Sequence, residues 1–214
     1  MGHSYAGGIG SPGGNNQEST SEAVQSWTAL FFLGSLLGDE AMRDVGAFGY
    51  QAESNATMEY WFNRSGSNWP AAYDEAQDVV GILWNNSYVY GTFFSAAPQH
   101  IYGIQWLPLS PPLKYFVDGV SSQWSDDLYE GLMQRILQDQ KAQDTLAASH
   151  GVISEADVGT DWGNVLLGYR LFSDPSYVNK KFEAWLNSED PDERDTVYSD
   201  LGGLTYYYSH AHTS

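Results

Sequence analysis

Residues 15–38 read NNQESTSEAVQSWTALFFLGSLLG, a polar loop that runs into a long apolar segment. Apolar or small side chains recur along it at helical spacing, at Ala23, Trp27, Leu30 and Gly34. With Asn15 as N-cap, Glu18 falls at the third helical position and is placed to close a capping box. The segment therefore predicts a helix from Asn15 or Asn16 to a stop at Gly38. Its C-terminal half is apolar nearly all round, so we expect that half to be buried on most sides.

The helical pattern continues through the chain around one short β segment. A second helix is expected over residues 39–60, with an inner face at Met42, Val45, Gly49, Ala52 and Ala56. Residues 79–84 and 88–94 are β-branched and aromatic and flank Asn85-Asn86-Ser87, which predicts a small hairpin. Further helices are expected from Ser125, from Thr160 or Asp161, and from the pair Asp174-Pro175. The predicted class is all-α, with antiparallel helical hairpins and a small β-hairpin in a single domain, residues 1–214.

Composition excludes several partner classes. The net charge is −18, from 27 acidic and 9 basic residues, and such a field repels nucleic acid and anionic membranes. Aromatic residues make up 15% of the chain, which fits a large core or a cleft of flat rings that stack on sugars. There is no cysteine, so we expect no disulfide and no thiolate metal site. His210 and His212 have metal-like spacing without a third ligand, so we expect no metal and no cofactor.

Two carboxylates, Glu18 and Glu22, are four residues apart at the start of the first predicted helix. On one helix face their Cβ atoms would be about 5–6 Å apart, and like charges there repel. Stability alone does not favour that arrangement, whereas glycoside hydrolysis requires paired carboxylates. The competing interpretation is structural, with Glu18 as a capping residue and Glu22 as an ordinary solvated one.

Several blocks of the sequence together resemble glycoside hydrolase family 81, the endo-β-1,3-glucanases. They are HSYAGG at residues 3–8, NQESTSEA at 16–23, YGTFFS at 90–95, IYGIQWLP at 101–108 and, more weakly, DWGNV at 161–165. The first two blocks are the most specific, and the others add order and spacing over nearly the whole chain. The resemblance implies the C-terminal part of an (α/α)6-type barrel.

The same resemblance implies an inverting β-1,3-glucan hydrolase. Glu18 matches the general base that activates a water, and Glu22 matches a second carboxylate that supports the water or the base. Inverting enzymes hold their two working carboxyls about 6.5–9.5 Å apart, so Glu18 and Glu22 are too close to be the acid and base. The family's general acid is an aspartate in an upstream aromatic block that this chain does not contain. We therefore expect a C-terminal fragment of a longer enzyme, poorly active or inactive alone.

The residues expected to bind substrate follow from the matching blocks. Trp106 and Tyr102 are candidates for a stacking platform, and His3 either reaches the sugar or packs its loop. The full set of expected substrate-binding residues is His3, Asn16, Gln17, Tyr102, Gln105 and Trp106. The expected partner is β-1,3-glucan alone, and we expect a monomer that is secreted and part of cell-wall polysaccharide degradation, although the chain carries no signal peptide.

Two other functions fit the same sequence. One is a non-catalytic β-glucan-binding module that keeps the aromatic cleft and has no activity to lose. The other is a structural helical scaffold without affinity for laminarin.

Overall fold

The computed structural model describes part of the chain, namely residues 16–84, 87–107, 110–116, 122–144, 163–171, 173–191 and 194. The chain forms two compact units, which are described separately: Met1–Ala96 with Ile104–Pro108, and Ala97–Gly103 with Leu109–Ser214. The single domain over residues 1–214 stays a prediction. Within the described residues the structure is helical with one small antiparallel sheet, which confirms the predicted fold class.

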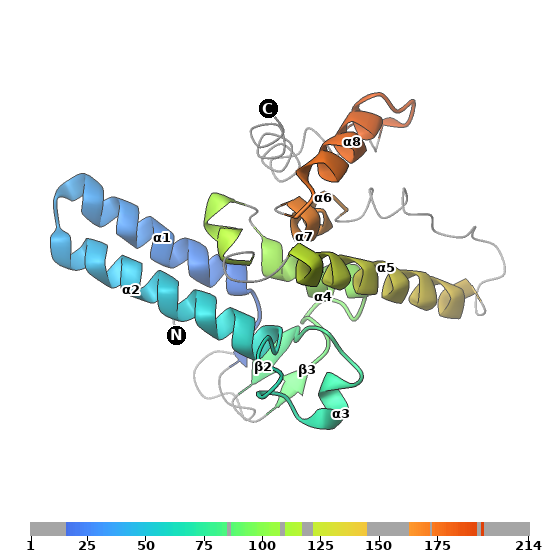
Figure 1. Cartoon of the computed structure of the whole chain (residues 1–214), viewed down its shortest axis with the longest axis horizontal. Coiled ribbons are helices and arrows are strands. Elements are labelled where there is room, and N and C mark those ends of the chain that lie inside the picture. The colour runs from blue at the N-terminus through green and yellow to red at the C-terminus, as the bar shows by residue number, and fades with distance from the viewer. Residues whose placement is uncertain are drawn as a thin grey trace. The chain divides into compact units, whose positions relative to one another are not determined.

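The first unit is built on an antiparallel pair of helices, α1 (Thr20–Leu37) and α2 (Glu40–Ala56), which lie side by side (Figure 1). Gly38 ends α1 with a backbone φ of 70°, as the sequence predicted. Asp39 then caps α2 by accepting a hydrogen bond from the Met42 N–H at 3.0 Å. Because the connection is this short, the second helix has to return along the first.

The two helices touch backbone to backbone where each carries glycine. A Cβ atom on Gly46 of α2 would lie 2.7 Å from the Cα of Phe31 in α1. A Cβ atom on Gly34 of α1 would lie 2.8 Å from the Cα of Arg43 in α2. Carbon atoms in favourable contact are about 3.5–4.0 Å apart, so these positions have no room for a side chain.

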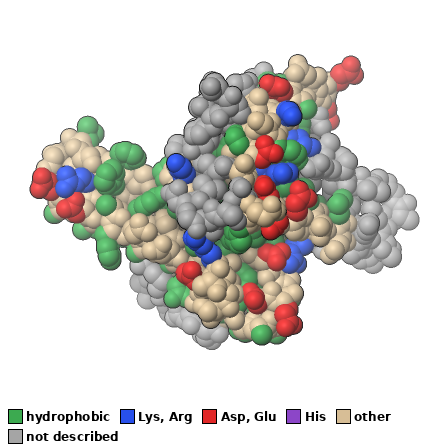
Figure 2. Space-filling model, in the orientation of Figure 1, with side chains coloured by type: hydrophobic (Ala, Val, Ile, Leu, Met, Phe, Trp, Pro, Cys, Tyr) green, Lys and Arg blue, Asp and Glu red, His purple; other side chains and the backbone are tan. Residues whose placement is uncertain are grey.

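The outer part of this hairpin exposes large apolar side chains, visible as green surface on the left of Figure 2. Leu36 is 83% exposed and Phe48 is 76% exposed. The other members of this exposed apolar surface are Phe32, Leu33, Leu37 and Val45. The prediction that the C-terminal half of α1 is buried is therefore wrong, because helical periodicity identifies apolar residues without identifying what covers them. No helix in the described part of the chain is long and apolar enough to cross a membrane.

The helix α1 begins four residues later than the capping pattern of Asn15 and Glu18 predicts. Its N-cap is Ser19, whose Oγ accepts a hydrogen bond from the Glu22 N–H at 3.3 Å. The predicted capping box is therefore wrong, and Glu18 lies before the helix rather than inside it.

A three-stranded antiparallel sheet accounts for this difference. The predicted hairpin is present as β2 (Ile82–Trp84) and β3 (Tyr88–Val89), with Ile82 opposite Val89. The sequence did not predict the third strand, β1 (Asn16–Gln17), which pairs with β2 and places Asn16 opposite Trp84. Pairing with β2 fixes Asn16 and Gln17 in an extended conformation, so the helix starts after them.

The second unit consists of shorter helices around an aromatic core. Its elements are α4 (Pro98–Gly103), a 3₁₀ turn (Pro111–Phe116), α5 (Ser122–Asp144), α6 (Gly163–Leu166), α7 (Gly168–Leu171) and α8 (Pro175–Leu186). Asp174 caps α8 ahead of Pro175, as predicted. The helix α5 begins at Ser122 rather than Ser125, because the buried Ser125 hydroxyl donates to the Tyr169 carbonyl instead of capping a helix.

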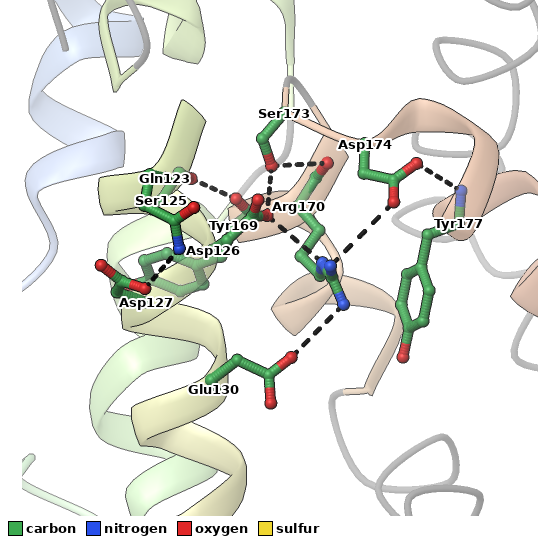
Figure 3. A network of polar contacts seen from close by, with 10 residues as sticks. All are labelled: Gln123, Ser125, Asp126, Asp127, Glu130, Tyr169, Arg170, Ser173, Asp174 and Tyr177. Atoms are coloured by element: carbon green, nitrogen blue, oxygen red, sulfur yellow. Dashed lines mark hydrogen bonds and ion pairs between the residues drawn. The ribbon is translucent and has the colours of Figure 1, made fainter. Parts of the chain in front are cut away.

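Arg170 of α7 links the helices of the second unit (Figure 3). Its guanidinium lies 3.3 Å from Asp126 Oδ1 of α5 and 4.0 Å from Asp174 Oδ2 at the start of α8. It also lies over the Tyr177 ring of α8, 4.2 Å from the ring centroid. Asp126 is therefore part of an interhelical ion pair.

Candidate functional site

Glu18 lies between β1 and the N-cap of α1, in the first unit. Its side chain is half-buried, and its Oε1 accepts a hydrogen bond from the main-chain N–H of Phe93 at 2.9 Å. Within the described residues, Oε2 makes no hydrogen bond. The carboxylate is thus held at one oxygen by a segment distant in sequence, and its other oxygen remains able to accept a proton.

The surroundings raise the pKa of the Glu18 carboxyl above its ordinary value. Burial has the largest effect and disfavours the charged form. The hydrogen bond from the Phe93 N–H acts in the opposite direction, and the negative charge of Glu22 raises the pKa further. A carboxylate with a raised pKa binds a proton more strongly, as a general base must.

Glu22 is exposed on the first turn of α1. The prediction that Glu18 and Glu22 share one helix face is wrong, because Glu18 precedes the helix. The two carboxylates are still close enough for the charge of Glu22 to act on Glu18. The two carboxylates therefore interact electrostatically, although Ser19, the N-cap, lies between them in the sequence.

The N-terminus of α1 is anchored by the 3₁₀ turn Ile104–Trp106, which belongs to the same unit. Gln105 Oε1 accepts hydrogen bonds from the Thr20 N–H at 3.1 Å and the Thr20 hydroxyl at 2.8 Å. The Ser19 hydroxyl donates to the Ile104 carbonyl at 3.1 Å. These bonds satisfy polar groups at the helix start and fix the residue that follows Glu18.

Three of the expected substrate-binding residues prove to be core residues. Tyr102, Gln105 and Trp106 are each 0% exposed. Tyr102 packs against Tyr169 in the second unit, with ring centroids 5.9 Å apart, and offers no face to a ligand. The stacking platform at Tyr102 and Trp106 stays a prediction, and the full burial of both rings in this structure does not support it.

The remaining expected contacts have different outcomes. Asn16 is fully buried in β1, whereas Gln17 beside it is half-buried. His3 lies outside the described residues. Across the part of the chain that is described, no group of three or more His, Cys, Asp or Glu side chains is arranged to hold a metal ion.

The sequence missed Phe93 and Phe94, although both belong to the YGTFFS block. Phe93 is 51% exposed and Phe94 is 58% exposed. Both residues close the segment 88–94 that the sequence predicted as the second strand of the hairpin. In the structure β3 ends at Val89, so Phe93 and Phe94 lie in the turn that follows it.

The sequence of this chain matches one family of glycoside hydrolases. The family described as glycosyl hydrolase family 81 C-terminal domain matches residues 1–143. The glucan endo-1,3-beta-D-glucosidase of Thermobifida fusca (strain YX) is 29% identical over 192 residues, which cover 89% of this chain and 22% of that relative. The primary septum glucan endo-1,3-beta-D-glucosidase of Schizosaccharomyces pombe is 30% identical over 128 residues, covering 58% of this chain and 12% of that relative.

A solved structure has the same fold. It is a variant of a glycoside hydrolase family 81 protein from Clostridium thermocellum, with a TM-score of 0.73 and 22% sequence identity. The alignment covers 99% of this chain and 26% of that chain. The present chain therefore spans about a quarter or less of the length of these relatives.

Proposed function

The chain belongs to the glycosyl hydrolase family 81 C-terminal domain family, and from that membership we propose that it supplies the general base, Glu18, of a β-1,3-glucan hydrolase. The observation that carries this proposal is the environment of Glu18. One carboxylate oxygen is held by the Phe93 N–H, and burial together with Glu22 raises the carboxyl pKa. A fixed carboxylate of raised pKa is suited to take a proton from a water molecule.

We propose that hydrolysis inverts the anomeric carbon. Glu18 removes a proton from water as the water oxygen attacks that carbon, and a separate acid protonates the departing sugar oxygen. Glu22 is the supporting carboxylate, because its charge increases the proton affinity of Glu18. Gln17 and His3 remain proposed sugar contacts, whereas Asn16 is buried in the strand that leads to Glu18.

The general acid, in this proposal, comes from a part of the enzyme that this chain does not hold. The matched relatives are several times longer than the segment they share with it. The exposed apolar surface of α1 and α2 supports the same idea, because contiguous apolar patches on soluble proteins mark contact surfaces. We propose that this surface packs against the remainder of the catalytic unit, and that the (α/α)6-type barrel is completed there.

A complementation assay tests the proposal. The chain is mixed with the part of the Thermobifida fusca relative that precedes the matched segment. Laminarin hydrolysis is then followed by the release of reducing sugar. Glu18→Gln is expected to lower the rate at least about a hundredfold, since general-base catalysis contributes about 10²–10⁴-fold. Glu75→Gln, an exposed glutamate of the same unit outside the α1–α2 hairpin, is the matched control and should leave the rate unchanged.

Other outcomes of this assay and of a binding measurement distinguish a hydrolase from a binding module. Wild-type rates with Glu18→Gln would refute Glu18 as the base, and full turnover by the chain alone would refute the missing acid. Laminarihexaose binding by the chain, with no hydrolysis by the complemented mixture, would instead identify a binding module. Inversion is checked from the anomer first formed, by proton NMR.

We also propose that the enzyme is secreted, acts as a monomer and degrades cell-wall glucan. The name of the Schizosaccharomyces pombe relative, which refers to septum glucan, supports the cell-wall part. Size-exclusion chromatography with light scattering tests the monomer.

A further inference from the structure

Phe93 holds Glu18 through its main chain and at the same time exposes its aromatic ring. Its main-chain N–H donates to Glu18 Oε1 at 2.9 Å, and its side chain is 51% exposed. Phe32, Phe48 and Phe94 of the same unit are exposed as well, so exposure alone does not distinguish Phe93. What distinguishes Phe93 is that its own main-chain N–H holds the proposed base.

The turn that carries Phe93 is fixed by its own hydrogen bonds. The Thr92 N–H donates to the Ser95 carbonyl at 2.8 Å, and the Thr92 hydroxyl donates to the same carbonyl at 2.9 Å. The Ser95 N–H returns a bond to Thr92 Oγ1 at 2.9 Å. The start of the turn also packs on Gly81, where an added Cβ would lie 2.8 Å from Gly91 N. These contacts fix the main-chain position from which the Phe93 side chain extends.

Trp84 of β2 supports the ring at one side. The two ring centroids are 6.3 Å apart and the planes are at 67°, an edge-to-face arrangement. Such contacts favour a defined ring orientation. Half of the Phe93 side chain remains open to solvent even with Trp84 in place.

We propose that the exposed Phe93 ring is a stacking surface for a glucosyl unit of the substrate, beside the bond whose hydrolysis Glu18 assists. This inference rests on the proposed function. Phenylalanine has no polar group in its side chain, so its partner has to present an apolar face. The C–H groups of a β-linked glucopyranose form such a face, while its hydroxyls point outward from the ring. Because one residue holds the carboxylate and contacts the sugar, the stacked unit and the base keep a fixed spacing.

Binding of laminarihexaose to the whole 214-residue chain, measured by isothermal titration calorimetry, tests the inference. Phe93→Ala should weaken binding about tenfold, the size of effect expected from one lost aromatic contact. Phe93→Tyr should restore binding to within about threefold of wild type, because it keeps the ring. Phe48→Ala removes an exposed phenylalanine elsewhere on the unit and should leave the dissociation constant unchanged.

The hydrogen bond to Glu18 provides a separate check. Phe93→Ala keeps the main-chain N–H, so carbon-detected NMR titration of the Glu18 carboxyl should give nearly the wild-type midpoint. An altered midpoint together with weak binding would show that the loop had moved, and would overturn a direct role of the ring.

Failure of this inference is distinguishable from failure of the proposed function. Wild-type binding by Phe93→Ala would overturn the stacking role and leave Glu18 as the proposed base. Absence of binding by the wild-type chain would overturn the stacking role as well, whereas the complementation assay with Glu18→Gln would still decide the base.

Discussion

Replacing Gly46 by alanine is expected to separate α1 from α2 and destabilise the first unit. The new Cβ would lie 2.7 Å from Phe31 Cα and closer still to Phe31 N. Both are main-chain atoms in the middle of a helix, so no side-chain rotation removes the clash. The helices have to move apart by about 1 Å to restore ordinary contact.

The size of the effect is a balance of two contributions. Overpacking of a fitted interface costs about 1–3 kcal/mol. Alanine recovers about 0.5–1 kcal/mol over glycine within a helix. The net loss is therefore about 1–2 kcal/mol in the free energy of unfolding, which corresponds to a Tm lower by about 2–8 °C for a chain of this size.

Thermal unfolding followed by far-ultraviolet circular dichroism measures the change. Ala47→Gly is the matched control, because Ala47 is exposed in the same turn of α2 and reports the intrinsic difference between the two residues. It should destabilise by about 0.5–1 kcal/mol. A Gly46→Ala protein as stable as wild type would refute the backbone-to-backbone crossing.

Substitutions at three other positions test the environment of Glu18, the anchor of α1 and the ion pair of the second unit. Burial raises the pKa of Glu18 above the unfolded value of 4.5, so the stability present below pH 4.5 declines as pH rises through the folded-state pKa. Glu18→Gln should thus raise Tm near neutral pH and leave it unchanged below pH 4.5; an equal Tm difference at every pH would contradict this. Gln105→Leu leaves the buried Thr20 N–H and hydroxyl without an acceptor and should cost about 2–3 kcal/mol in urea unfolding, where an unchanged midpoint would refute the anchor. Arg170→Ala should lose about 1–3 kcal/mol by leaving the Asp126 carboxylate with the Ser173 hydroxyl but without its cation, and Arg170→Lys should restore less than half, which urea unfolding also measures.

Local patterns in the sequence predicted the elements whose ends are determined locally. Gly38 ends α1 because a left-handed residue closes the helix there, and Asp174 caps the helix that Pro175 begins. The β2–β3 hairpin followed from its β-branched and aromatic residues. In each case the residues that decide the structure are neighbours in the chain, so a single sequence contains the necessary information.

Features that depend on distant partners were not predictable in the same way. Asn15 and Ser19 are comparable N-cap candidates, and the pairing of Asn16 with Trp84 across the sheet decides between them. The family motif predicts Gln105 as a sugar contact, and in the structure its side-chain oxygen accepts two hydrogen bonds from Thr20. A motif identifies conserved chemistry in a family without separating residues that touch the ligand from residues that support them.

The start of α1 matters for the chemistry of Glu18. At the third position of a helix, the Glu18 carboxylate would bond the main chain of its own N-cap, and the helix dipole would stabilise its charge and lower its pKa. Between β1 and Ser19 it instead accepts one hydrogen bond from Phe93, and burial prevails to raise its pKa. The first environment describes a structural cap, whose lowered pKa makes the carboxylate a weak proton acceptor. The second describes a carboxylate that is oriented by a remote loop and still able to bind a proton, as the proposed role of Glu18 requires. The strand pairing that places the helix start four residues later is therefore what gives Glu18 this environment.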